Sequence, residues 1–127
     1  DRFIFSSEVL FSAGRSDLSK EGKSEISNVT EILSSIMKNI PENIDWVIRV
    51  DGHTDNTPLS GAGEFKDNWE LSQARALSVV KYMIKELNFS GSRLAANGFG
   101  EYQPISLEDT PEARALNRRI EIKLTER

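Results

Sequence analysis

The sequence predicts an α/β (α+β) sandwich in which two long helices pack on one mixed sheet, in the order β-α-β-α-β-β. Residues 19–40 and 67–88 place apolar side chains at steps of three and four, which is typical of helices with one buried face. The β-branched run at 44–50 predicts a buried strand, and the alternation at 120–124 predicts a half-exposed strand. A strand, a helix and a second strand in succession favour a crossover unit, whose ligand crevice lies at a strand's carboxyl end.

The composition is that of one ordinary globular domain spanning residues 1–127. The chain has 38% hydrophobic and 28% charged residues, and its length suffices for one core. The net charge of −4 argues against a nucleic-acid partner, because phosphate binding needs a basic surface. No cysteine is present, so disulfides and thiolate metal sites are excluded. No apolar run is long enough to span a bilayer, and the chain opens on Asp1; we therefore expect a domain excised from a longer, membrane-anchored protein.

The first third of the chain supplies a strand and the first long helix. Residues 2–5 and 9–11 are apolar runs broken by two serines, which predicts a kinked strand or two short strands. Gly14, in the loop that follows, is expected to adopt an unusual backbone angle. The helix begins at the Ser19 cap and ends before Pro41. Its buried stripe comprises Ile26, Val29, Leu33, Ile36 and Ile40, widened by Ile32.

The middle third leads from the central strand to the second helix. Trp46, Ile48 and Val50 share one face of the strand, which delivers residues 51–55 to the rim of the sheet. Residues 56–67 have no apolar period and contain proline and glycine, so they form an exposed loop. Asp67 or Asn68 caps the helix, which ends near Asn88 or Gly91. Its buried stripe comprises Ala76, Val79, Val80, Met83, Ile84 and Leu87.

The last third supplies two more strands. Residues 93–98 predict a short strand, and a proline after Thr110 predicts a short helix over 112–116. In the closing strand, 117–124, Arg118 shares the face of Ile120 and is expected to need an anion.

Two opposite charges are predicted to meet at the rim of the sheet. Asp55 follows the central strand, and Arg75 lies two turns along the helix from Asn68 on nearly the same face. A guanidinium binds a carboxylate through two parallel hydrogen bonds, and an Asp oxygen accepts from an ammonium group. The pattern predicts an amino-acid-like, zwitterionic ligand.

Four motifs connect this pair to a known family. They are G-H-T-D at 52–55, N-W-E-L-S-Q-A-R-A at 68–76, G-F-G-E-Y-Q-P at 98–104 and N-R-R-I-E-I at 117–122. Together they resemble the OmpA C-terminal-like peptidoglycan-binding domain over residues 9–124. Trp69, the T-P-L after Asn56 and the long loop before the helix are most similar to the MotB-type flagellar stator branch.

The resemblance implies a role for each residue at the rim. Asp55 and Arg75 would hold the diaminopimelate residue of the peptidoglycan stem peptide, with Asn68 beside them. Weaker matches at lining positions are Thr54, Thr57 and Leu71. Asp55 and Asn68 also fit plain turn and cap roles.

Two further positions each have a binding and a structural interpretation. Arg118 either neutralises Asp55 in a structural ion pair or meets the ligand's carboxylate. Phe11 matches an aromatic near the family's pocket but equally fits a buried core position. Ser12 and Gly14 stand where many relatives carry aspartate and asparagine, which puts polar contacts from that loop in doubt.

The sequence offers no catalytic nucleophile, metal site or cofactor site. His53 is the single histidine, and we expect a structural, hydrogen-bonded role for it. The expected function is therefore non-catalytic binding of peptidoglycan that anchors a membrane complex, of the flagellar ion-driven stator type, to the cell wall. We expect a homodimer in the periplasm, joined to the inner membrane or, alternatively, the outer membrane. The alternatives are a porin- or lipoprotein-type wall tether, a protein-interaction or dimerisation module using the same cleft, a metal-dependent wall hydrolase using His53, and a spacer that has lost ligand binding.

Overall fold

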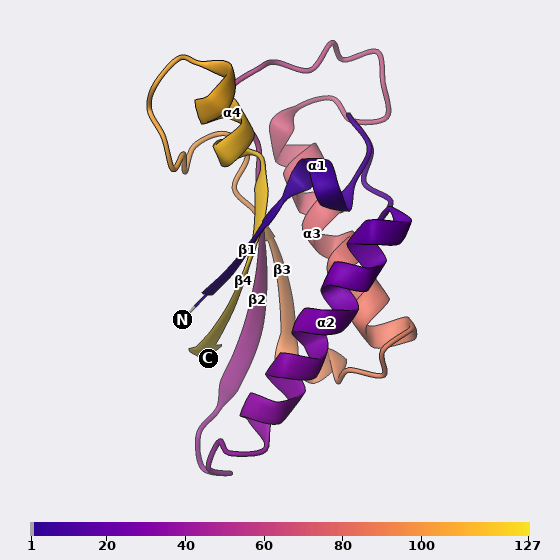
Figure 1. Ribbon diagram of the computed structural model, residues 1–127, viewed down its shortest axis with the longest axis vertical. Helices are drawn as coiled ribbons and strands as arrows, with labels where there is room; N and C mark the ends of the chain where they lie inside the picture. Colours follow the sequence, from indigo (N-terminus) through magenta and orange to yellow (C-terminus); the bar gives the residue numbers. More distant parts are fainter. Residues whose placement is uncertain (1) are drawn as a thin grey trace.

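Two long helices, α2 and α3, cover one face of a four-stranded sheet in the computed structural model, which describes residues 2–127 (Figure 1). The predicted order of strands and long helices is confirmed, and so is the predicted short helix after Thr110, which is α4. Two short helical elements within residues 2–127, α1 and η1, were not predicted. The elements are β1 (Arg2–Ser6), α1 (Ser7–Leu10), α2 (Lys20–Met37), β2 (Trp46–His53), α3 (Asn68–Lys85), the 3-10 turn η1 (Gly91–Arg93), β3 (Leu94–Gly98), α4 (Pro111–Asn117) and β4 (Arg119–Glu126). No helix in this part of the chain is both long and apolar enough to cross a membrane.

The sheet has the order β1-β4-β2-β3, so β2 is internal as predicted. The β2 and β3 strands pair in parallel through the α3 crossover, whereas β4 runs antiparallel to both of its neighbours. The prediction that β4 is half-exposed was wrong, because β4 lies between two strands and Glu121, on its polar side, is only 2% exposed. Alternation of charged and apolar residues does not distinguish a solvated face from one covered by long ion-paired side chains.

Buried ion pairs cover the sheet face that carries no long helix. Asp51 pairs with Arg49 at 2.9 Å and with Lys123 at 3.5 Å, while Glu121 pairs with Arg119 at 2.5 Å. Burial alone would raise the pKa of Glu121, but the hydrogen bond and the charge of Arg119 outweigh it and hold that pKa below its usual value. Two buried carboxylates and the cations that pair with them therefore cover this face.

The helix stripes are confirmed in part. Ile26, Val29 and Leu33 of α2 are buried, but Ile32 is exposed, because it lies about 100° around the helix from Leu33. Ile36 is exposed as well, and α2 ends at Met37, four residues before Pro41. In α3 the residues Ala76, Val79, Val80 and Met83 are buried, whereas Ile84 is exposed and Leu87 lies beyond the helix end.

The expected strand at residues 9–11 was also wrong. Residues 7–10 form α1, in which the Ser6 side chain caps the helix by accepting a hydrogen bond from the Glu8 N–H at 3.2 Å. A side-chain oxygen that takes up a free amide N–H favours a helical turn over a strand kink. Leu10 enters the core, and Phe11 forms an isolated bridge with Leu18.

A pair of glycines lets α3 approach the sheet closely. Gly52 and Gly98 are partners across β2 and β3. A Cβ on Gly52 would lie 2.2 Å from the carbonyl oxygen of Ser72, and one on Gly98 would lie 2.5 Å from the backbone nitrogen of Gln73. The first turns of α3 therefore rest directly on the carboxyl ends of the two parallel strands.

The predicted caps at Ser19, Asp67 and Thr110 are confirmed. Each side chain accepts a hydrogen bond from a backbone N–H in the first turn of its helix, at 2.9, 2.9 and 3.1 Å respectively. Glu70 does not complete a capping box, because its carboxylate accepts the N–H of Lys66. Gly14 has the predicted positive φ, +71°.

The expectation of a hydrogen-bonded His53 was wrong. His53 is 5% exposed, and neither ring nitrogen has a hydrogen-bond partner among residues 2–127. The imidazole stacks on the ring of Phe99 with centroids 5.1 Å apart. Burial, and then the positive charge of Arg119, lowers the pKa of His53 to about 4.

This histidine is expected to make the fold acid-sensitive. Between about pH 6.5 and about pH 4 the unfolded chain binds a proton at His53 that the folded chain does not, so the free energy of unfolding falls as the pH falls through this window. The loss attributable to His53 approaches about 3 kcal/mol at the lower end. His53→Phe keeps the stacked ring and removes the titration, so urea unfolding of this variant should lose less stability between these pH values. Equal losses in both proteins would exclude His53 as the cause.

Candidate functional site

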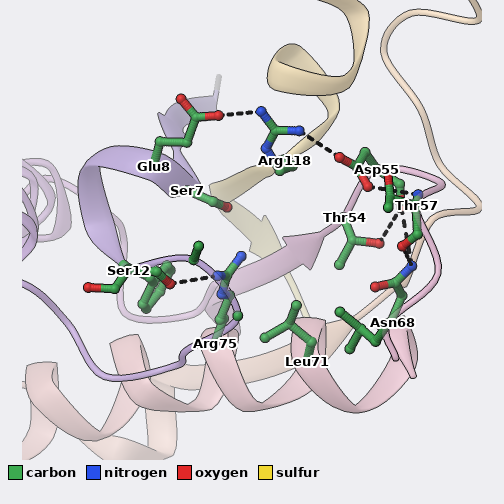
Figure 2. A pocket seen from close by; sticks show the side chains of 14 residues that line it. Ser7, Glu8, Ser12, Thr54, Asp55, Thr57, Asn68, Leu71, Arg75 and Arg118 are labelled. Carbon is green, nitrogen blue, oxygen red and sulfur yellow. Dashed lines mark hydrogen bonds and ion pairs between the residues drawn. The ribbon is translucent and has the colours of Figure 1, made fainter. Parts of the chain in front are cut away.

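A cavity of about 620 Å³ opens at the carboxyl end of β2 (Figure 2). It is bounded by the strand end, the first two turns of α3, α1 with the loop after it, and the residue that precedes β4. All eight residues predicted from the sequence line it: Phe11, Thr54, Asp55, Thr57, Asn68, Leu71, Arg75 and Arg118. The other lining residues are Ser7, Glu8, Ser12, Ala13, Gly14 and Leu59.

Arg75 is a buried cation held by backbone carbonyl groups. Its side chain donates from Nε to the carbonyl of Arg15 at 2.7 Å and from Nη2 to that of Ser12 at 3.2 Å, and it lies 5.0 Å from the ring centroid of Phe11. Within residues 2–127 no carboxylate forms an ion pair with it, although the residue is only 6% exposed. Burial, followed by the charge of Arg118, lowers the pKa of Arg75 to about 10. Two of five N–H groups are used, which leaves three for an anion.

Asp55 lies across the cavity and is already paired. One carboxylate oxygen accepts the backbone N–H of Thr57 at 2.8 Å, and the other accepts from Arg118 Nη1 at 2.6 Å. The structural interpretation of each residue is therefore confirmed: the aspartate anchors its loop, and the arginine forms the ion pair. Both side chains also line the cavity, so a binding role for each stays a prediction. Figure 2 shows Asp55 and Arg75 on separate walls, with no bond between them.

Arg118 also contacts Glu8. Its second terminal nitrogen donates to the Glu8 carboxylate, so one guanidinium bridges two acids. Burial lowers the pKa of Arg118, but the hydrogen bonds that it donates to Glu8 and Asp55 outweigh burial, and the pKa stands above its ordinary value. Sequence reasoning missed Glu8 because the surrounding residues were interpreted as a strand and no motif includes it.

The remaining predicted residues brace the site. Asn68 does not cap α3, since Asp67 does; its amide instead donates to the carbonyls of Asp55 at 3.3 Å and Thr57 at 3.1 Å. Thr54 donates to the carbonyl of Asp55 at 2.8 Å. The strand end and the helix start are thereby held together, which fixes the distance between the charged walls.

The loop with the two family departures still contributes to the site. Ser12 offers its backbone carbonyl to Arg75, and Gly14 lines the cavity in a left-handed conformation. Ser12 thus contributes to the site through its backbone carbonyl. Among residues 2–127 no group of three or more His, Asp or Glu side chains is arranged to hold a metal ion.

Comparisons with known proteins show similarity over most of the chain. The model of the OmpA family matches residues 10–118. Motility protein B of Bacillus subtilis is 33% identical over 94% of this chain and 42% of its own length. Outer membrane protein Omp38 of Acinetobacter baumannii is 39% identical over 92% of this chain and 30% of its own length. Peptidoglycan-binding protein ArfA of Mycobacterium tuberculosis is 35% identical over 80% of this chain and 29% of its own length. The chain thus spans less than half the length of these curated relatives.

Solved structures share the fold over nearly the whole chain. A MotB-like protein from Desulfovibrio vulgaris superimposes with a TM-score of 0.86 at 29% identity, covering 99% of this chain and 73% of that one. The periplasmic domain of Helicobacter pylori MotB superimposes with a TM-score of 0.82 at 28% identity, covering 98% of this chain and 81% of that one. The cell wall anchor of the T6SS from Pseudomonas aeruginosa superimposes with a TM-score of 0.81 at 26% identity, covering 98% of this chain and 80% of that one.

Proposed function

Since the chain belongs to the OmpA family, we propose that its cavity binds peptidoglycan without catalysis, through the diaminopimelate residue of the stem peptide. The free end of diaminopimelate carries an ammonium and a carboxylate on one carbon. Its carboxylate would meet Arg75, and its ammonium would meet the acidic wall that contains Asp55. The names of two similar proteins, a peptidoglycan-binding protein and a cell wall anchor, support a wall ligand.

The observation that carries this proposal is the buried guanidinium of Arg75, which has no ionic partner within residues 2–127. A buried charge without an ionic partner costs free energy, which a ligand carboxylate would recover on binding. Three N–H groups of the guanidinium have no acceptor within residues 2–127 and could donate to a ligand carboxylate. The carbonyls of Ser12 and Arg15 hold the guanidinium in a fixed orientation. The cavity is thus preorganised for an anion, which lowers the entropic cost of binding.

The binding is expected to be weak at one site and strong in an assembly. A few charge-assisted bonds at a wet surface correspond to dissociation constants of roughly micromolar to millimolar. Several copies on one wall would gain greatly in avidity. We propose that the domain serves as the periplasmic wall anchor of a membrane complex, of the ion-driven stator type, and works as a homodimer. The solved structures of MotB-type domains, which superimpose with TM-scores of 0.82 to 0.86, support this choice. A porin-type tether is the second candidate, because outer membrane protein Omp38 is 39% identical over 92% of the chain.

A comparison of two stem peptides tests the ligand chemistry. Lysine carries the ammonium of diaminopimelate but lacks the adjacent carboxylate, so it would leave Arg75 unpaired. We expect calorimetric titration to show binding of a diaminopimelate-containing tripeptide and an at least about 100-fold weaker interaction with the lysine-containing tripeptide. Equal affinity for both peptides, or binding of neither, would exclude this mode of recognition.

A further inference from the structure

The acidic wall of the cavity contains three charged side chains. Arg118 lies between Asp55 and Glu8 and donates a hydrogen bond to each carboxylate, as Figure 2 shows. Its side chain is 30% exposed, whereas that of Asp55 is 11% exposed. The three residues come from α1, from the loop after β2 and from the residue before β4, so the cluster joins distant parts of the chain.

The charge of this wall depends on Glu8. Asp55 and Arg118 neutralise each other at 2.6 Å, so together they offer little attraction to an incoming ammonium group. Glu8 adds a second carboxylate for the same guanidinium, and the three residues then carry a net charge of −1. Arg75 on the opposite wall carries the balancing positive charge. The cavity as a whole is neutral but polarised, which complements a zwitterion.

We propose that Glu8 is a specificity-determining residue, which supplies the residual negative charge that selects a ligand with a free ammonium group. This inference rests on the proposed function and refines its ligand class. Peptidoglycan cross-links acylate the side-chain amine of diaminopimelate and remove its charge. The cavity should therefore prefer stem peptides whose amine is free over stems whose amine is acylated.

Glu8 lies outside the segment that the family model matches, and its side chain lies outside the core. It lies before residue 10, where the match to the family model begins. Its side chain is 61% exposed and contributes nothing to the core, so its replacement should leave the fold intact. Solvent screening at this exposure limits its effect on affinity.

Two ligands and three proteins test the proposal. The ligands are the diaminopimelate tripeptide with a free side-chain amine and the same tripeptide with that amine acetylated. Glu8→Gln should bind the free amine about tenfold more weakly than wild type and the acetylated peptide within about twofold of wild type. Glu31→Gln makes the same charge change on the exposed side of α2, outside the cavity, and should match wild type with both ligands.

A double variant separates charge from tethering. Glu8→Gln combined with Arg118→Gln removes one charge of each sign and restores the net charge of the wall, so binding of the free amine should recover to within about threefold of wild type. If Glu8 serves only to tether α1, the double variant will bind no better than Glu8→Gln alone, which overturns the proposal. Unchanged binding by Glu8→Gln overturns it as well, while leaving the proposed function standing. A wild-type protein that binds neither peptide overturns both.

Discussion

Replacing Arg75 by glutamine is expected to abolish sedimentation of the domain with purified, protein-free peptidoglycan sacculi. The substitution removes the charge and replaces the five N–H groups of the guanidinium with the two of a shorter amide side chain. Truncation of one partner in a desolvated ion pair typically costs several kcal/mol, so the affinity should fall by at least about 100-fold. The fold should survive, because Arg75 has no ionic partner within residues 2–127 and its removal leaves no buried carboxylate unpaired.

The matched control is Arg114→Gln. Arg114 lies on α4 and pairs with Asp109 at 2.9 Å, outside the cavity. This variant has the same change in net charge and should sediment like wild type. If Arg75→Gln sediments as well as the control does, then the cavity does not hold the wall. If both variants are lost from the pellet, attraction to the wall depends on overall charge and not on this site.

Gly52→Ala is expected to lower the free energy of unfolding by about 3 kcal/mol or more. Its new Cβ would lie 2.2 Å from the Ser72 carbonyl oxygen, a backbone atom that cannot move without displacing α3. Overpacking against backbone costs more than overpacking against a flexible side chain, because the whole helix must shift. That shift would also separate Arg75 from the loop after β2, so sacculus binding should weaken in parallel.

Urea unfolding followed by circular dichroism measures the effect. Gly63→Ala is the control, since a Cβ there would meet no atom within 4 Å and the residue lies in the loop between β2 and α3. Its stability should lie within about 0.5 kcal/mol of wild type. A Gly52→Ala variant as stable as this control would show that α3 does not rest on the strand ends as described.

Long periodic segments could be predicted from the sequence, and short or atypical ones could not. The α2, β2 and α3 elements bury enough apolar side chains at a clear period to identify them. The α1 helix has four residues, too few to establish a helical period, and its Ser6 cap resembles a break in a strand. The central position of β4 was missed because Glu121 and Lys123 look solvated in sequence, although Glu121 is buried against Arg119.

The site, too, contains features that could be predicted from the sequence and features that could not. Asp55 and Arg75 could be predicted to face one cavity, because each lies at a fixed step from a strand end or a helix start. The ion pair of Asp55 with Arg118 was one of the two alternatives predicted for Arg118. The contact of Glu8 with Arg118 could not be predicted, because the two residues come from opposite ends of the chain and no motif includes Glu8. The hydrogen bonding of His53 was mispredicted for the same reason. Whether its ring nitrogens find partners depends on the residues that pack over β2, and the local sequence does not identify those residues.

The most direct measurement is a residue-by-residue titration of the isotope-labelled domain with the free-amine diaminopimelate tripeptide, followed by NMR. Binding in the cavity predicts chemical-shift changes that concentrate on the amides of residues 54–57, 68–75 and 12–15 and on the Arg75 side chain. Shifts confined to the ion-paired face of the sheet or to the outer sides of α2 and α3 would contradict the account.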